Sequence, residues 1–194
     1  MSTIAENIAS VRVRMAEAAR AAGRSPQEIL LCGASKMNDA AACREAISAG
    51  IDCLGENRVQ EMVQKRSEHA YVGAPLHFIG VLQKNKVRQV VGQVDLIHSV
   101  DSMGLLDEID KRAAMNGLTQ NILLNIGGED SKSGFRPEEV ESAIKAVLAR
   151  PERHVRIQGL MAIPPIAEKK GENMPYFLEM RHLFVDSTPL LLHN

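Results

Sequence analysis

The strongest constraint on the fold is a regular alternation of short apolar runs with segments whose apolar residues recur at helical spacing. An amphipathic helix is predicted from Ile4 to Ala22, and Gly23 follows it as a helix C-terminal glycine would. The run 29–35 is continuously apolar and ends in small residues, which is typical of a strand buried on both faces. The complete set of predicted strands is 29–35, 53–57, 76–80, 96–100, 121–126 and 157–163, followed in turn by helices at about 39–49, up to 65, 84–91, 103–115, 137–148 and 174–184.

Strands that alternate with helices predict parallel pairing through right-handed crossovers, in either a doubly wound sheet or a (β/α)8 barrel. Polar or small residues recur at the C-terminal ends of the predicted strands, among them Lys36, Asn57, Gly80 and Asp101. In a barrel these strand ends converge on one mouth, where active sites lie, so the pattern favours a TIM-type barrel.

Only six of the eight units are recognisable, and the last residues, 184–194, carry no seventh or eighth unit. A closed barrel normally takes about 250 residues. Pro189 is predicted to end any helix in this segment. Residues 1–194 are therefore predicted to form a single α/β domain, an incomplete barrel without the usual last two βα units.

Composition narrows the class of partner. The chain has 194 residues, 45% of them hydrophobic, and a formal charge of −1, which is typical of one globular domain. Its basic residues are scattered, which argues against nucleic acid as a partner. The apolar runs are far shorter than the roughly 18 residues that span a membrane, and no signal peptide is recognisable. We expect a cytoplasmic protein with a small-molecule ligand and no membrane partner.

The three cysteines, Cys32, Cys43 and Cys53, stand at spacings that match no zinc knuckle and no Cys-x-x-Cys pair. They are predicted to be reduced and mostly buried, and the spacing predicts no metal site.

Lys36 is the first candidate for chemistry because it directly follows a predicted buried strand. An amine partly removed from water at such a position suits imine formation. A lysine that ends a strand can equally extend its ammonium into solvent. Position alone leaves both interpretations open.

Five ordered segments decide between them, because together they resemble the signature blocks of the YggS/PROSC family of pyridoxal phosphate homeostasis proteins. The resemblance extends from the N-terminal helix to about Phe184. The segments are Ala34-Ser-Lys36, Gly55-Glu-Asn-Arg-Val-Gln-Glu61, His77-Phe-Ile-Gly-Val-Leu-Gln-Lys-Asn-Lys86, Asn125-Ile-Gly-Gly-Glu-Asp-Ser-Lys-Ser-Gly134 and Gly159-Leu-Met-Ala-Ile-Pro164.

The resemblance implies a barrel similar to the N-terminal domain of alanine racemase, with pyridoxal 5'-phosphate (PLP) in a Schiff base to Lys36. It implies cofactor binding and supply without catalytic turnover, with apo PLP-dependent enzymes as recipients. Racemases of this fold add a second domain and a catalytic tyrosine, whereas the tyrosines here are Tyr71 and Tyr176. The oligomeric state is left open.

Two alternatives remain. A PLP-dependent amino-acid racemase or lyase would need a second acid–base group, for which His77 and Lys132 are the candidates. The second alternative is a remnant of the family that no longer binds the cofactor. In the family, the phosphate is held by turns after the seventh and eighth strands, and no segment here matches them. Loss of several charge-assisted hydrogen bonds of roughly 1.5–3 kcal/mol each predicts weakened affinity in a C-terminally truncated member.

Four further residues are candidates for cofactor contact, each with a structural alternative. Asn57 is predicted to reach a ring substituent of PLP or to cap the following helix. His77 contacts the cofactor or has a buried structural role, according to strand register. Met161 packs against the pyridine ring or fills the core. Lys132 offers a second amine or an anion contact, or is a solvated loop lysine.

Overall fold

The computed structural model describes residues 2–127, 133–169 and 171–192. The chain divides into two compact units, residues 1–80 and 81–194. Each unit is built from parallel strands alternating with helices.

The first unit begins with a long helix whose start is fixed by local chemistry. Thr3 and Glu6 form a capping box, in which the Thr3 side chain accepts from the Glu6 amide at 3.2 Å and the Glu6 carboxylate accepts from the Thr3 amide at 2.8 Å. The elements of the unit are α1 (Ile4–Ala21), η1 (Pro26–Glu28), β1 (Cys32–Ala34), α2 (Ala40–Ser48), β2 (Cys53–Glu56), α3 (Val59–Ser67) and β3 (Leu76–Phe78).

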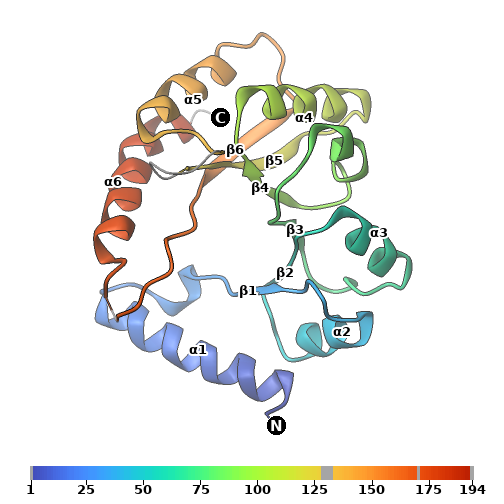
Figure 1. The fold of residues 1–194 in the computed structure, drawn as a ribbon, viewed down its shortest axis with the longest axis vertical. Helices are drawn as coiled ribbons and strands as arrows, with labels where there is room; N and C mark the ends of the chain where they lie inside the picture. The colour runs from blue at the N-terminus through green and yellow to red at the C-terminus, as the bar shows by residue number, and fades with distance from the viewer. Residues whose placement is uncertain (1, 128–132, 170, 193–194) are drawn as a thin grey trace. The chain divides into compact units, whose positions relative to one another are not determined.

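Strand β2 lies between β1 and β3, and both pairs are parallel. Gly55 of β2 lies opposite Ala34 on one side and His77 on the other. Helices α2 and α3 lie on the same side of the three strands (Figure 1). Side chains of one strand alternate between its two faces, so this register decides which residues share a face.

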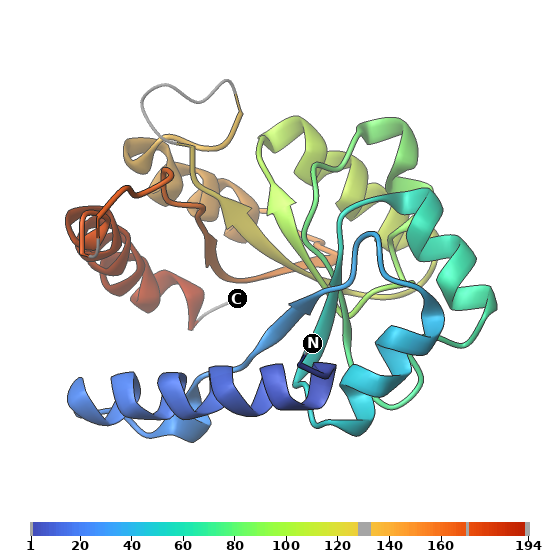
Figure 2. The ribbon, with the colours of Figure 1, turned by 60° about the horizontal axis from the view of Figure 1, so that its bottom comes forward.

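The second unit repeats the arrangement, with β5 between β4 and β6 (Figure 2). Burial alternates along β5, where Gln120, Ile122 and Leu124 are buried, and α4 packs against all three strands of the unit. The elements are η2 (Lys84–Gln89), β4 (Leu96–Val100), α4 (Met103–Met115), β5 (Gln120–Asn125), η3 (Pro137–Glu139), α5 (Val140–Leu148), β6 (Val155–Met161) and α6 (Met174–Leu191).

Two expectations from the sequence are wrong. The predicted helix 84–91 is the short 3-10 helix η2, which ends at Gln89. Pro189 does not end a helix but lies inside α6. The hydroxyls of Ser187 and Thr188 donate to carbonyls four residues earlier at 2.7 and 2.8 Å, so the turn around the proline keeps hydrogen bonds that do not need its missing N–H.

The three thiols are free, with Cys43 and Cys53 buried and Cys32 half-buried, as predicted. Across the described ranges, none of the helices has both the length and the apolar character needed to cross a membrane.

Candidate cofactor site

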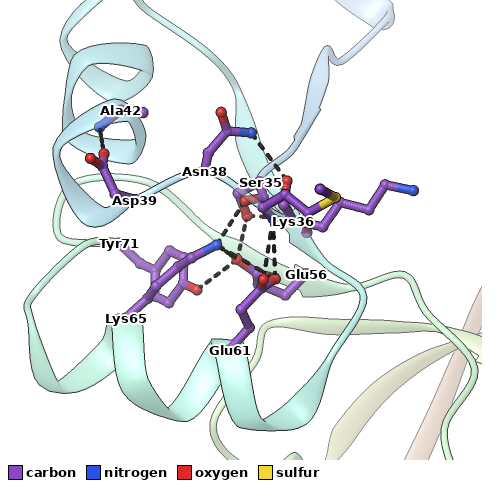
Figure 3. Close-up of polar contacts among 11 residues, drawn as sticks. Ser35, Lys36, Asn38, Asp39, Ala42, Glu56, Glu61, Lys65 and Tyr71 are labelled. Atoms are coloured by element: carbon purple, nitrogen blue, oxygen red, sulfur yellow. Dashed lines mark hydrogen bonds and ion pairs between the residues drawn. The ribbon is translucent and has the colours of Figure 1, made fainter.

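Lys36 lies in the loop between β1 and α2, two residues beyond the end of β1 at Ala34. Its side chain is exposed and points away from the polar groups beneath it (Figure 3). The expected partial desolvation of this amine is therefore wrong, because the strand ends before the lysine. The backbone is restrained instead, since the Lys36 carbonyl accepts a hydrogen bond of 3.2 Å from the side chain of Asn38.

A buried polar cluster lies beneath this loop and is centred on Glu56, the last residue of β2. Its side chain is fully buried, and Oε1 accepts hydrogen bonds from Lys65 Nζ and Ser35 Oγ, both at 2.7 Å, and from Tyr71 OH at 3.0 Å. Burial and the nearby Glu56 carboxylate raise the pKa of Tyr71 far above its ordinary value. The buried cation and the two hydroxyls offset the burial of the charge through Oε1, while Oε2 is buried without a hydrogen-bond partner among the described residues.

Helix α3 connects this cluster to the Lys36 loop through two residues one helical turn apart. Lys65 Nζ donates to the Ser35 carbonyl at 2.7 Å, and the Glu61 carboxylate accepts from the Met37 amide at 3.2 and 3.3 Å. Met37 has a positive φ of 63°, a conformation that costs a side-chain-bearing residue free energy unless its surroundings fix it. The residues on both sides of Lys36 are thus anchored to α3.

Asn57 follows β2 and offers a hydrogen-bond acceptor. Its Oδ1 atom is buried and has no hydrogen-bond partner among the described residues. The N-cap of α3 is Arg58, so the alternative role predicted for Asn57, as the cap of this helix, is wrong. The backbone of Asn57 is held against Gly80, where an added Cβ would lie 2.1 Å from the Asn57 carbonyl oxygen.

His77 is half-buried on β3. The pairing register of β3 with β2, which the sequence did not reveal, brings it beside two cysteines. The metal-ligating atoms of Cys32, Cys53 and His77 all lie within 4.8 Å of one another. Hydrogen bonds link Cys53 to Cys32 and to His77, so the ring has partners within the protein.

The two remaining candidates, Met161 and Lys132, do not belong to the first unit. Met161 ends β6 in the second unit, half-buried and opposite Asn125. Lys132 lies outside the described residues.

Sequence reasoning missed the support beneath Lys36. Lys65 and Tyr71 lie in none of the family-like segments, and they meet Glu56 only because the chain folds α3 and the residues after it back onto β2. The spacing of Glu61 and Lys65, one turn apart on a predicted helix, was the available signal.

Comparison with known proteins defines the class first. Residues 4–188 match the family described as alanine racemase, N-terminal domain. An alanine racemase from Clostridium difficile superposes with a TM-score of 0.69 at 17% identity, covering 83% of this chain and 43% of that one, which is a likeness of fold. The predicted fold class is confirmed: among the described residues, parallel strands alternate with helices in each unit, and the chain matches the alanine racemase N-terminal-domain family.

Closer relatives narrow the class. The pyridoxal phosphate homeostasis protein of Pseudomonas aeruginosa is 41% identical over 189 residues, or 96% of this chain and 81% of the relative. That of Aquifex aeolicus is 40% identical over 180 residues, or 92% of this chain and 78% of the relative. The chain therefore belongs to the family of pyridoxal phosphate homeostasis proteins. PipY of Synechococcus elongatus, solved with PLP bound, superposes with a TM-score of 0.82 at 31% identity, covering 98% of this chain and 84% of that one.

Proposed function

We propose that this protein binds PLP through a Schiff base at Lys36 and acts as an intracellular carrier in PLP homeostasis, without catalytic turnover. Residues 1–194 contribute to a single cofactor-binding domain under this proposal. The observation that carries it is the exposed amine of Lys36 on a backbone fixed from both sides.

PLP supplies an aldehyde, which condenses with a primary amine and releases water. The residues around Lys36 favour this reaction by position. Anchoring Ser35 and Met37 to α3 lowers the conformational entropy that the loop would lose on binding. The side chain of Lys36 itself is exposed and so remains accessible to a ligand from solution.

Asn57 provides a test of whether the residues fit the cofactor. A buried acceptor without a partner costs free energy in the unliganded protein, and a ligand donor that reaches it removes this cost. PLP carries a ring hydroxyl and, when protonated, a ring N–H, so it has donors of the required kind. Asn57 and Lys36 therefore suit the donors and the aldehyde of PLP.

The tyrosines support a carrier more than an enzyme. Racemisation requires a second acid–base group that exchanges a proton with the substrate. The Tyr71 hydroxyl donates to Glu56 within the buried cluster, and the Tyr176 hydroxyl donates to the Ile163 carbonyl at 3.2 Å. Both tyrosines of the chain are thus engaged by the protein itself. The names of the relatives, as homeostasis proteins, agree with this interpretation.

The test is a visible absorption spectrum of the protein mixed with PLP, followed by borohydride reduction and mass mapping of the modified lysine. We expect imine absorbance and a reduced adduct on Lys36, both lost in Lys36→Ala. Lys111→Ala, which removes an exposed lysine of α4, is the matched control and should leave both unchanged. Adducts scattered over surface lysines, equal in native protein and Lys36→Ala, would refute binding at Lys36.

Two further assays separate carrier from enzyme. The PLP-loaded protein is mixed with an apo PLP-dependent enzyme, and recovery of that enzyme's activity is followed. Exchange of the α-proton of amino acids is measured in deuterated water with the loaded protein alone. A carrier transfers cofactor without exchange, whereas sustained exchange would establish the racemase or lyase alternative.

A further inference from the structure

Three metal-ligating side chains from three adjacent strands converge in the first unit. Cys32 of β1 lies directly opposite Cys53 of β2, and His77 of β3 lies opposite Gly55, two residues further along β2. Alternation places Cys53 and residue 55 on the same face of β2, so all three ligands approach one another across that face. Their Sγ and ring-nitrogen atoms lie within 4.8 Å of one another.

This separation is close to what a tetrahedral metal ion requires. With Zn–S near 2.3 Å and Zn–N near 2.0–2.1 Å, ligand atoms around zinc stand roughly 3.5–4 Å apart. Each pair of ligands here therefore needs to contract by about 1.3 Å at most, which side-chain rotations can supply. Two thiolates and one imidazole also suit zinc better than the hard cations Mg²⁺ and Ca²⁺.

Gly55 keeps the space between the strands open. A Cβ at this position would lie 3.0 Å from Cys32 Sγ and 2.7 Å from the side chain of Ile79. A side chain at residue 55 would thus enter the region where the two sulfurs and the imidazole meet.

Burial is graded across the cluster. Cys53 is 3% exposed, while Cys32 and His77 are half-buried. An ion can therefore reach the ligands from the side of Cys32 and His77, and Cys53 provides a ligand from which water is excluded.

We propose that Cys32, Cys53 and His77 form a zinc-binding site, with the fourth position taken by water or an exogenous ligand. The two thiols lose their protons on binding, so the two thiolates balance the charge of Zn²⁺. The site uses side chains other than Lys36, and it goes beyond the proposed PLP-carrier function.

The reduced, metal-free protein, without PLP, is titrated with Zn²⁺ in competition with a chromophoric chelator. Co²⁺ is added in a parallel titration as a spectroscopic probe. We expect one ion per chain, with the thiolate charge-transfer band and visible bands of four-coordinate Co²⁺. Cys32→Ser, Cys53→Ser and His77→Gln should each weaken binding by more than the roughly 10–100-fold lost when a residue that merely supports a ligand is changed.

Cys43→Ser is the matched control, because Cys43 is buried on α2 outside the cluster, and it should bind zinc as the native chain does. Lys36→Ala should also bind zinc normally, which separates failure of this site from failure of PLP binding. Circular dichroism establishes that each variant is folded. A measurement on the native chain needs no variant: zinc should slow alkylation of Cys32 and Cys53, mapped by mass spectrometry, and leave Cys43 unaffected.

Three results would overturn the proposal. The first is that the native chain fails to compete with the chelator for zinc. The second is that folded His77→Gln and Cys32→Ser bind zinc as tightly as the native chain, and the third is that zinc leaves the alkylation of Cys32 and Cys53 unchanged. The mass of the chain can also be compared before and after reduction. A mass lower by two hydrogens before reduction, together with no zinc binding by the reduced chain, would identify the cysteine pair as a disulfide instead.

Discussion

The buried ammonium of Lys65 donates a hydrogen bond of 2.7 Å to the backbone carbonyl of Ser35, the residue that precedes Lys36. The same ammonium forms an ion pair of 2.7 Å with Glu56, and the two side chains are 6% and 0% exposed. The backbone next to the exposed Lys36 is therefore anchored by a buried lysine of helix α3.

Lys65→Met should destabilise the protein strongly, because it leaves the Glu56 carboxylate buried without its cation. Removal of one partner of a buried pair typically costs about 3–5 kcal/mol. The measurement is the free energy of unfolding from urea titration at neutral pH.

Two controls accompany Lys65→Met. The double variant Glu56→Gln, Lys65→Met should recover part of the loss, since no unpaired charge remains. Lys145→Met breaks an exposed pair with Glu141 and should cost about 1 kcal/mol or less. Equal losses in Lys65→Met and Lys145→Met would refute the importance of the buried pair.

Glu61→Ala should weaken the reaction of Lys36 with PLP by several-fold while lowering stability by only about 1 kcal/mol, the usual worth of a hydrogen bond. It removes the acceptor for the Met37 amide, so the residue after Lys36 loses its anchor on α3. The yield of borohydride-reduced adduct at fixed PLP measures the effect. Glu61→Gln retains an acceptor oxygen and should restore most of the yield; an unchanged yield in Glu61→Ala would show that this anchor is not needed.

Asp52→Asn should lower stability at neutral pH but not in acid. Partial burial acts to raise the pKa of Asp52, but hydrogen bonds from Arg12 and the Leu31 amide, with the guanidinium charge, outweigh it and leave the pKa below its ordinary 3.8. The unfolded chain thus takes up the proton first as pH falls. This stabilisation is complete above the ordinary pKa and is lost as pH falls through the lower pKa of the folded state.

The size of the Asp52 effect is limited by solvent, since the Arg12 and Asp52 side chains are 37% and 27% exposed. We expect a loss of about 1 kcal/mol or less in the Asn variant at pH 7. Urea titrations between pH 7 and pH 2 should show the native and variant curves converging in acid. Asp186→Asn, at an exposed position of α6, is the control, and a difference that persists undiminished at the lowest pH would contradict the assignment.

Gly80→Ala should be poorly tolerated, because the new Cβ would lie 2.1 Å from the Asn57 carbonyl oxygen, a backbone atom that cannot rotate away. Overpacking of this kind costs about 1–3 kcal/mol or more, measured by thermal or urea unfolding. Gly104→Ala places its Cβ 2.5 Å from Lys84 Nζ, the end of a flexible side chain, and should be nearly neutral. Similar losses in the two variants would argue against close packing of Asn57 and Gly80.

Local pattern predicted much of the secondary structure. The helix expected at 103–115 is α4 with the same bounds, and the strand expected at 96–100 is β4. Both have strong signals, an amphipathic repeat in one and a compact apolar run in the other. The interpretation of Pro189 failed because a propensity rule took no account of the neighbouring hydroxyls that bond to the helix carbonyls.

The site was predictable only in part. Lys36 was singled out because it follows a predicted strand and stands in one of five segments that resemble a known family, whereas Lys65 of α3 and Tyr71, which follows α3, meet Glu56 of β2 across separations of 9 and 15 residues only in the folded chain. The expected desolvation of Lys36 was wrong because β1 is shorter than its apolar run.

The sequence by itself determined the alternation of strands and helices, the parallel α/β class and the place of Lys36 after the first strand, because periodicity and strand ends are local properties of the chain. Only the tertiary structure decided which way His77 faces and that Cys32 and Cys53 lie beside it. The physical reason is register: a shift of one residue turns every side chain of a strand to the opposite face, and register is fixed by pairing and burial between segments distant in sequence.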